Sequence, residues 1–465
     1  MMYGAILAVY VLIILGIGFY TSRYIKNMDD FALAGRNLGL PMLVGTLFAS
    51  FVGGATVTGW TGSFYQLGFD WWFAGIGSLL GVAVAATVMA EKSRKLEQYT
   101  VPDLLELRYD NKTKVVGSIM IILGDIGLVA VQIIALSGIL TAFVGLETMP
   151  AMILSIIVFT LIALFGGMVG VALTDSIQAI IIALGLIVGV ISAFSYGGGI
   201  GAVFSDLPDN FLTPLGTTSP GEAFNNAIAV FGTTAVWQAI IFSRAFAAKD
   251  SRTAKMGILW LIPTSLIGYF LVAMLGYSAR SILGPDVVPD EVFATLLSEV
   301  MNPAVAAILL AVIVGAIITS TNSFLLSISI NITRDLYQNF IGKDSSDKSL
   351  LKVGRVSLVI VAALAFSLAV AMPDIVTAIV FAYTMYSAAL LIPLYGGYLW
   401  KKANSTAGFL GIIFGGGTAV IWHLLNEPMG LPPMVPAVIL SLIVFVASSY
   451  MTEGPSKEQL KVFDV

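Results

Sequence analysis

Long runs of apolar residues alternate with short polar segments along the whole chain. A helix of about 20 apolar residues crosses the hydrocarbon core of a bilayer, so each run of that length predicts one membrane span. We predict thirteen spans in an all-α polytopic membrane protein. They lie near residues 2–22, 41–65, 72–91, 115–143, 150–167, 172–197, 223–245, 256–281, 303–333, 353–372, 375–399, 406–425 and 434–452.

The basic residues test this division, because loops on the cytoplasmic side of a membrane are enriched in Lys and Arg. If the N-terminus faces outward, every one of the 23 basic residues except Arg280 falls in an inner segment. If one span had been missed or wrongly added, every later loop would be assigned to the wrong side of the membrane. We therefore expect a multi-pass protein of the cell membrane, with its N-terminus outside and its C-terminus in the cytoplasm.

Composition narrows the class of protein. The chain is 58% hydrophobic and only 11% charged, whereas soluble domains carry roughly a quarter charged residues. Its net charge is -4 and it has no basic tract, which excludes nucleic acid as a partner. It contains no cysteine, which removes disulfides and thiol chemistry. The lone His423 ends an apolar run, and we expect an interfacial or structural role for it.

Two spans contain helix-weakening residues near their middle. These are Gly53-Gly54 in the second span and Gly232-Thr233-Thr234 in the seventh. A broken helix at membrane depth is tolerated only where the freed backbone groups find partners, and a pair of such breaks at corresponding places indicates a binding site. The alternative is that these glycines only allow helices to pack closely.

The two interrupted spans are five helices apart, which is an odd number, so they run in opposite directions. This parity predicts an inverted repeat, with one copy at 41–197 and the other at 223–399. A leading helix and loop (1–40), an external loop (198–222) and two peripheral helices with a tail (400–465) complete a single transmembrane domain over 1–465.

Ionisable residues inside membrane spans are costly, at about 2.5 to 3.5 kcal/mol each on insertion scales, and are therefore functional candidates. Asp125 and Asp175 are the only acidic residues well inside the predicted spans, and we expect no Lys or Arg there. Asp125 should lie near the midplane, with Gln132 at i+7 on the same face. The alternative for either carboxyl group is a structural, hydrogen-bonded role.

The ninth span carries a stripe of small and hydroxyl-bearing residues. Its members recur at i, i+3, i+4, i+7 and i+11, which places them on one helical face: Ala316, Thr319, Ser320, Ser323 and Ser327. Neutral hydroxyls can offer several oxygens to a small hard cation, and no His or Cys cluster exists for a softer metal. The alternative is that the hydroxyls bond their own backbone or hold helices together.

Several segments together resemble the sodium/solute symporter family, which includes bacterial proline, pantothenate, sialic acid and galactose transporters. The likeness covers nearly the whole chain. It rests on FALAGRNL from Phe31, YTVPDLLELRY from Tyr99, GGMVGVALTDSIQ from Gly166, Gln238 with Arg244, AAKD from Ala247, the stretch Thr319 to Asp335, and Pro393 with Trp400-Lys401.

This resemblance implies a leucine-transporter-like fold, with one helix before and two after an inverted five-helix repeat. It also implies a sodium ion between the unwound second span and the ninth span. The ligands would be the carbonyl oxygens of Ala49, Val52 and Ala316 and the hydroxyls of Thr319 and Ser320. The family's acidic residue that is linked to sodium binding or release falls on Asp175.

The chain departs from the family's sugar-transporting branch. That branch has polar side chains around the first break, where this chain reads Phe51 to Ala55, and paired aromatics that fall here on Thr234 and Ala235. The Gln238 to Arg244 spacing is closer to the proline-transporting branch, although that branch's Asp near the first break falls on Phe51. We therefore expect an amino acid or a carboxylate rather than a sugar.

The hypothesis from the sequence is a sodium-coupled secondary active symporter that works by alternating access, and not an enzyme. We expect the solute, Na+ and the lipid bilayer as its partners, and a monomer. Expected solute contacts are Gly53, Gly54, Thr56, Asp125, Gln132, Thr233, Thr234, Gln238, Tyr383 and Ser387. Rival interpretations are a proton-coupled carrier that uses Asp125 or Asp175, a solute sensor, and a membrane-embedded enzyme.

Overall fold

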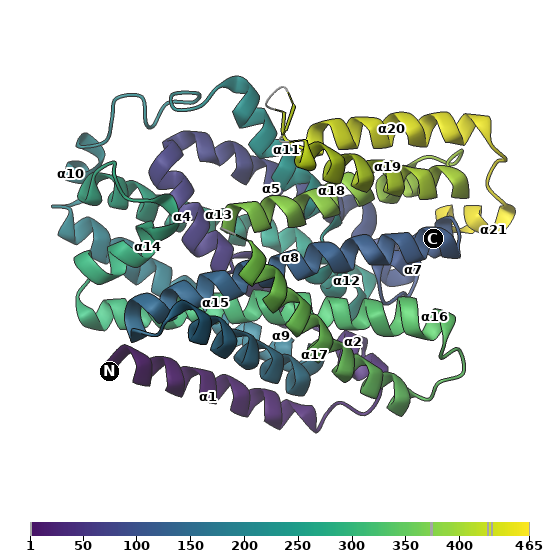
Figure 1. Cartoon of the computed structure of the whole chain (residues 1–465), viewed down its shortest axis with the longest axis horizontal. Helices are drawn as coiled ribbons and strands as arrows, with labels where there is room; N and C mark the ends of the chain where they lie inside the picture. Colours follow the sequence, from purple (N-terminus) through teal and green to yellow (C-terminus); the bar gives the residue numbers. More distant parts are fainter. Residues whose placement is uncertain (1, 373–374, 426, 429–430, 465) are drawn as a thin grey trace.

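The computed structural model describes residues 2–372, 375–425, 427–428 and 431–464, and in this part the chain is a bundle of helices (Figure 1). The long helices are α1 (Met2–Ser22), α3 (Leu40–Phe51), α4 (Gly54–Leu67), α5 (Trp72–Val84), α8 (Asn111–Val144), α9 (Thr148–Tyr196), α11 (Pro220–Val236), α13 (Ser251–Leu283), α15 (Pro303–Ile330), α17 (Asp347–Ala371), α18 (Ile375–Leu399), α19 (Ser405–Leu424) and α20 (Met434–Met451). Shorter segments used below are α7 (Val101–Arg108), α12 (Ser243–Ala247), α21 (Lys457–Leu460), and the π-helical turns η4 (Gln238–Phe242) and η7 (Asn331–Tyr337).

Ten helical segments in the described part of the chain are long and apolar enough to cross a membrane. Two of them are much longer than one crossing needs: Gly54–Lys95 has 42 residues and Thr148–Tyr196 has 49. Each contains a glycine with positive φ, Gly68 at 54° and Gly167 at 50°, where the chain changes direction. The all-helical membrane fold is confirmed, whereas the count of thirteen spans stays a prediction.

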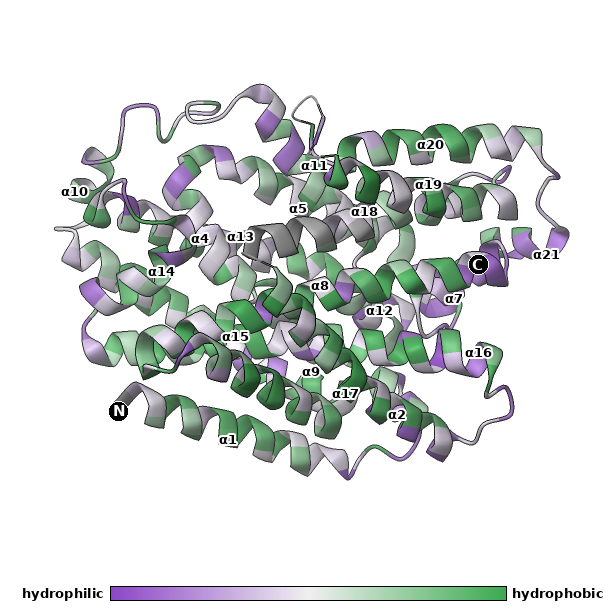
Figure 2. Cartoon of the chain, in the orientation of Figure 1, coloured by the Kyte–Doolittle hydropathy of each residue, from purple (hydrophilic) through white to green (hydrophobic). Residues whose placement is uncertain are grey.

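The surface of the bundle fits a lipid environment. Figure 2 shows hydrophobic residues along the lengths of the helices and hydrophilic residues gathered mainly at the two ends of the bundle. Large apolar side chains such as Leu12 on α1 and Ile267 on α13 are more than half exposed, at 65% and 61%. An apolar perimeter of this extent is stable only when lipid covers it.

The first predicted break is present. Helix α3 ends at Phe51, Val52 adopts φ -88° and ψ 49°, and Gly53 is extended before α4 begins at Gly54. Glycine is required at the break because a Cβ on Gly53 would overlap the Ser320 hydroxyl. The backbone groups released here lie at membrane depth, so they define where polar partners must gather.

The second predicted break is wrong in position. Gly232, Thr233 and Thr234 are helical residues of α11, and the helix breaks at Trp237, where ψ is 96°. Gly232 instead allows close packing, because an added Cβ would lie 2.9 Å from the Ser387 side chain of α18. The break is stabilised by the Tyr395 hydroxyl, which donates to the Ala235 carbonyl oxygen at 2.6 Å.

Helices α5 and α11 pack against each other in very close contact. Gly77 faces the backbone of α11, so a Cβ at this position would overlap the Ala227 carbonyl group. Overpacking of this kind costs about 1–3 kcal/mol. By contrast, a Cβ on Gly138 of α8 would meet nothing within 4 Å.

We therefore expect Gly77→Ala to lower the apparent melting temperature of the purified protein by several degrees. Gly138→Ala is the matched control, and it should leave the temperature unchanged or raise it slightly, because alanine is the better helix former. Thermal unfolding in detergent measures both. Equal melting temperatures for the two variants would contradict the close approach of α5 and α11.

Candidate functional site

A cluster of oxygens lies where the break between α3 and α4 meets α15. The Thr319 hydroxyl contacts the carbonyl oxygens of Ala49 at 3.0 Å and Ala316 at 2.9 Å. The Ser320 hydroxyl contacts those of Ser50 and Ala316, both at 3.1 Å. Each hydroxyl has one hydrogen to donate. Five oxygen atoms therefore share two hydrogens, which makes this cluster rich in negative potential and suited to a small cation.

The structure brings four of the five predicted sodium ligands together at this cluster: Ala49, Ala316, Thr319 and Ser320. The fifth, Val52, forms the C-cap of α3 inside the break. The carbonyl group in contact with Ser320 belongs instead to Ser50. The sequence offered no signal for Ser50, because which carbonyl group of a broken helix turns toward α15 depends on the local backbone angles.

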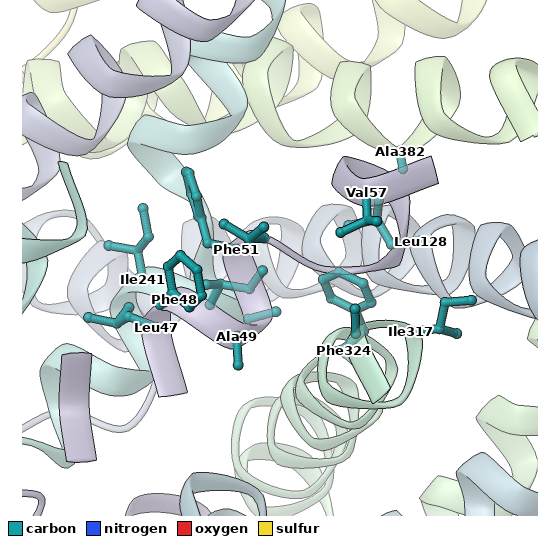
Figure 3. Close-up of a cluster of buried hydrophobic side chains, with 14 of the residues drawn as sticks. Leu47, Phe48, Ala49, Phe51, Val57, Leu128, Ile241, Ile317, Phe324 and Ala382 are labelled. Atoms are coloured by element: carbon teal, nitrogen blue, oxygen red, sulfur yellow. The ribbon is translucent and has the colours of Figure 1, made fainter. Parts of the chain in front are cut away.

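Apolar side chains enclose this break. Figure 3 shows Leu47, Phe48 and Phe51 near α3, and Ile317 and Phe324 on the side of α15. All five side chains are buried. An environment without water strengthens every electrostatic interaction within it, so the oxygen cluster would attract a cation more strongly than the same atoms in solution.

A buried ion pair lies one helical turn from the oxygen cluster. The Arg244 guanidinium, on α12, is 3.1 Å from Asp175 Oδ2, and both side chains are fully buried. The Thr46 hydroxyl donates to the same carboxylate oxygen at 2.6 Å, and the Ser50 hydroxyl does so at 3.1 Å. The other carboxylate oxygen, Oδ1, has no hydrogen-bond partner among the described residues.

Two hydroxyls connect this ion pair to the oxygen cluster. Arg244 donates to the Ser323 hydroxyl at 2.7 Å, and Ser323 contacts the Thr319 carbonyl oxygen at 3.0 Å. The Ser50 and Ser323 hydroxyls lie 3.2 Å apart. The ion pair is therefore connected by hydrogen bonds to α15 and to the break through these two side chains.

The expectation of no Lys or Arg inside the spans is wrong for Arg244. Its position near the end of the seventh span, followed by Lys249, is typical of an inner loop, yet its side chain is 0% exposed. The break at Trp237 and the π-helical turn η4 after it change which direction the following residues face. Arg244 consequently points into the bundle, where Asp175 compensates its charge.

A narrow pocket lies on the other side of the break. Most of its lining is aromatic or hydroxyl-bearing: Phe51, Thr56, Trp60, Ser78, Val230, Thr233, Thr234, Trp237, Tyr269 and Tyr383. The rings form one connected set, with Trp60 and Tyr269 centroids 4.4 Å apart and Phe51 and Trp237 centroids 6.0 Å apart. No charged side chain of the described residues is part of this lining.

Of the predicted solute contacts, four line this pocket: Thr56, Thr233, Thr234 and Tyr383. Gly53 and Gly54 form the adjoining break, and Ser387 lies behind the wall, 2.8 Å from the Thr233 hydroxyl. Gln132 faces Gly54, since a Cβ there would lie 3.0 Å from its Oε1. Asp125 and Gln238 are not among the lining residues.

Apart from Tyr383, the aromatic side chains of the lining were not among the predicted contacts, and Trp237 is the most informative of them. Trp237 follows the glycine and threonine triplet by three residues, so it was close to the expected break but not selected. Its indole Nε1 is buried and has no hydrogen-bond partner among the described residues, and the same holds for Gln132 Oε1. Unpaired buried polar atoms call for a partner such as a ligand or a water molecule.

The YTVPDLLELRY segment has a structural role at the end of the bundle that also carries α21 (Figure 1). Thr100 and Asp103 form a capping box at the start of α7. Arg108 at its end donates to the Ala403 carbonyl oxygen at 2.8 Å, which holds the turn after α18. Burial lowers the pKa of the Arg108 guanidinium and raises the pKa of the Tyr99 hydroxyl to about 12.

Comparison with known proteins relates this chain to a protein family. A family model described as the sodium:solute symporter family matches residues 31–415. The osmoregulated proline transporter OpuE of Bacillus subtilis (strain 168) is 26% identical, over 99% of this chain and 96% of its own length. The sodium/pantothenate symporter of Escherichia coli (strain K12) is 26% identical, over 95% of both chains.

Two solved structures share the fold. A Na+-coupled sialic acid symporter, in a substrate-bound outward-open state described as revealing a novel Na+-site, superposes with a TM-score of 0.86 at 19% identity, over 98% of both chains. MhsT in complex with L-phenylalanine superposes with a TM-score of 0.62 at 16% identity, over 88% of this chain and 98% of its own. At these identities the likeness concerns the fold alone.

The ion pair generates a prediction about stability. Arg244→Met should destabilise the protein by about 3–5 kcal/mol, because it leaves the Asp175 carboxyl group buried without a compensating charge. Arg244→Met combined with Asp175→Leu should recover most of that loss. Thermal unfolding of the purified variants gives the comparison.

The control for this pair is Arg355→Met, since the Arg355 side chain on α17 is exposed. It should unfold at the temperature of the parent protein. If Arg244→Met alone also matched the parent, the buried pair would not be a determinant of stability.

Proposed function

The chain belongs to the sodium:solute symporter family, and from that premise we propose that it moves a small amino acid or carboxylate across the cell membrane together with sodium, by alternating access. It is a multi-pass membrane transporter, not an enzyme. One observation carries the proposal for the coupling ion: the five-oxygen cluster, in which two hydroxyls are shared among three carbonyl oxygens at a helix break.

We extend the proposal to the architecture: thirteen spans with an inverted repeat of 41–197 and 223–399, a leading helix in 1–40, and peripheral helices in 400–465. Each repeat contributes one broken helix, at Val52–Gly53 and at Trp237. The two chain ends lie at opposite ends of the bundle, as an odd number of spans requires (Figure 1). The N-terminus would face outward, since all basic residues except Arg280 are assigned to the inner segments.

The proposed sodium site comprises the carbonyl oxygens of Ala49, Ser50 and Ala316 and the hydroxyls of Thr319 and Ser320, with the Val52 carbonyl group of the same break as the further ligand that the family resemblance implies. When sodium binds, both hydroxyls would turn their hydrogens away and present their lone pairs, as the carbonyl groups already do. A break in a membrane helix supplies such carbonyl oxygens without burying a formal charge. Neutral ligands allow the ion to leave again, which a transport cycle requires.

Asp175 has an accessory role in this proposal. Its carboxylate contacts Ser50, which carries one of the carbonyl groups of the oxygen cluster. Its Oδ1 has no hydrogen-bond partner among the described residues and would add negative potential near the site. Asp175 would therefore help sodium to bind or to leave, while Arg244 limits the energetic cost of its charge.

The site for the solute would be the aromatic pocket and the start of α4. The N-terminus of α4 has no side-chain cap, so its first N–H groups are free to bind a carboxylate. The Trp237 Nε1–H could donate a further hydrogen bond, and Gln132 Oε1 could accept one from an amine. An aromatic wall with few polar groups favours a compact zwitterion or carboxylate over a sugar, which needs many hydrogen bonds.

Sodium and solute would be coupled through the break itself. The oxygen cluster fixes Ala49, Ser50 and the adjoining backbone from one side, and Phe51 and Thr56 line the pocket on the other. Both ligands thus favour the same geometry of α3 and α4. By linkage, each then raises the affinity for the other by the same factor.

Sodium binding is tested by combining Thr319→Ala with Ser320→Ala. The purified parent should melt at higher temperature in sodium chloride than in potassium chloride, because an ion that binds only the folded state stabilises it. The double variant should need at least tenfold more sodium for the same shift. Thr321→Ala is the control, since its hydroxyl bonds the Ile317 carbonyl oxygen within its own helix. An unaltered sodium response in the double variant would contradict the proposed sodium site.

The pocket is tested by Trp237→Phe, which retains an aromatic ring and removes the indole N–H. A thermal-shift screen of amino acids, carboxylates and sugars in sodium chloride first identifies a stabilising solute. We expect Trp237→Phe to weaken the binding of this solute about tenfold, because one hydrogen bond is lost. The sodium response should stay unchanged. Trp71→Phe is the control, because Trp71 Nε1 is equally unpaired but lies outside the pocket lining. The same loss in both variants would count against this pocket.

A further inference from the structure

A second polar system lies between α8 and α15, away from the oxygen cluster and the pocket. On α8 it consists of Lys114, Ser118 and Asp125, spaced so that they share one helical face. On the facing helix it consists of Ser327, Asn331 and Asp335, each four residues after the last. All six side chains are buried, and we call them the α8–α15 stripe.

Asp125 is the inner limit of this stripe. Its side chain is fully buried, and the Tyr386 hydroxyl of α18 donates to its Oδ1. The Ser327 hydroxyl lies against the same carboxyl group. Its Oδ2 has no hydrogen-bond partner among the described residues. Asp175 has Arg244 to compensate its charge, whereas Asp125 has only neutral hydroxyls, so its ionised form is expensive at this depth.

From Asp125 a series of contacts leads toward the end of the bundle that carries α7. Ser327 accepts from the Gln238 amide at 3.2 Å, and the same amide donates to Asn331 Oδ1 at 2.9 Å. Gln238 also accepts from the Val101 backbone N–H at 2.9 Å, at the start of α7. Gln238 therefore joins the middle of the stripe to its outer part.

The outer part of the stripe reaches the surface. The Asp335 carboxylate accepts from the Thr100 hydroxyl at 3.0 Å and lies 3.7 Å from the Lys114 ammonium group. Lys114 also pairs with Asp103 at 2.7 Å and with Glu106 at 2.8 Å, and the Glu106 side chain is 41% exposed. Along α8, Asp125 lies about 16 Å from Lys114 at the rise of an α-helix.

Several polar atoms along the stripe have no hydrogen-bond partner among the described residues: Ser118 Oγ, Asp125 Oδ2, Asn331 Nδ2 and Asp335 Oδ2. Buried atoms of this kind usually bind ordered water. In addition, Asn331 and Asp335 lie in the π-helical turn η7, an irregularity that often marks functional positions. The stripe thus has the composition of a path for protons rather than that of a packed core.

We propose that Asp125 is a proton-binding site that exchanges protons with water at the α7 end of the bundle through the α8–α15 stripe. A hydronium ion at Glu106 gives up one proton, which arrives at Asp125 Oδ2. A new O–H bond forms there, the carboxylate becomes a neutral acid, and the hydronium ion becomes water. Release follows the same path in reverse.

The charged groups around Asp125 do not offer it a competing counter-ion. Helices α1, α4 and α18, which pack near α8, carry no charged residue. Helix α9 contributes Asp175, which Arg244 neutralises, and α19 carries only His423 at its far end. The charges of α17 lie in its first nine residues. The remaining titratable or charged groups on α8 and on the elements packed against it are the Tyr386 hydroxyl, Asp335, Lys114, Asp103 and Glu106 of the path, Arg334 of η7, Arg108 of α7 and Lys112 at the start of α8.

A proton suits this site better than sodium does. The described contacts of Asp125 are two hydroxyls, whereas the oxygen cluster at the break supplies five oxygens. A dehydrated cation needs several ligands, and a proton needs one oxygen atom. The site is also placed to affect the solute, because Tyr386 lies on α18 between Tyr383, which lines the pocket, and Ser387, which bonds Thr233. Solute affinity should therefore vary with pH.

The experiment is infrared difference spectroscopy of the full chain in liposomes, which detects the C=O stretching band of a protonated carboxyl group and needs no solute. The parent should show one such band that titrates with pH. Asp125→Asn should abolish it, and Asp209→Asn, in an exposed loop, should not. A sodium-induced thermal shift in Asp125→Asn verifies that the variant is folded and tests the sodium site separately.

The path is tested by a pH jump. Asn331→Leu should retain the band but slow its appearance at least tenfold, because a leucine side chain cannot carry protons or hold water. Asn322→Leu is the control in the preceding helix α15, since Asn322 is also buried but its side chain has no hydrogen-bond partner among the described residues, and its position nine residues before Asn331 puts it on the opposite face. A band that persists in Asp125→Asn would overturn the proposal, as would its removal by sodium at constant pH or equal rates in the two asparagine variants.

Discussion

The structure depends on one constraint: a polar backbone group in the interior of a bilayer must find a partner within the protein, because no water is available. Two helices are broken at that depth, at Val52–Gly53 and at Trp237. At the second break the Tyr395 hydroxyl satisfies the freed carbonyl group. At the first, two hydroxyls serve three carbonyl oxygens. That deficit of donors distinguishes the first break and is the ground on which we propose a cation there.

Asp175 and Asp125, two of the buried carboxyl groups, show two ways of meeting the cost of a charge in this environment. Asp175 is paired with Arg244 and held by the Thr46 and Ser50 hydroxyls. The adjacent guanidinium favours the ionised form of this carboxyl group. Among the described residues, the polar contacts of Asp125 are the Tyr386 and Ser327 hydroxyls, and these neutral groups favour the neutral acid. Identical side chains thus take different roles because one has a counter-ion and the other does not.

Much of the fold followed from the sequence, because lipid imposes a strong one-dimensional signal. The first predicted span, 2–22, coincides with α1 (Met2–Ser22), and the first break and the hydroxyl face of α15 lie where the pattern put them. The failures share a cause. Gly232 weakens a helix and also permits close packing, and the pattern cannot tell which of the two happens. Arg244 has the position of a loop residue, and only the rotation of the chain after Trp237 buries it. Ser50 acts through its backbone, which its side chain does not reveal.

Helix α15 contacts the broken helix, the ion pair and the α8–α15 stripe. One of its faces carries Thr319, Ser320 and Ser323, which contact the broken helix and the ion pair. Another carries Ser327, from which the stripe along α8 begins. A movement of α15 relative to α3 would therefore alter the oxygen cluster and the surroundings of Asp125 in the same step. Since a ligand shifts a conformational equilibrium only through its different affinity for the two states, sodium at one face and a proton at the other would act on the same equilibrium, with no direct contact between them.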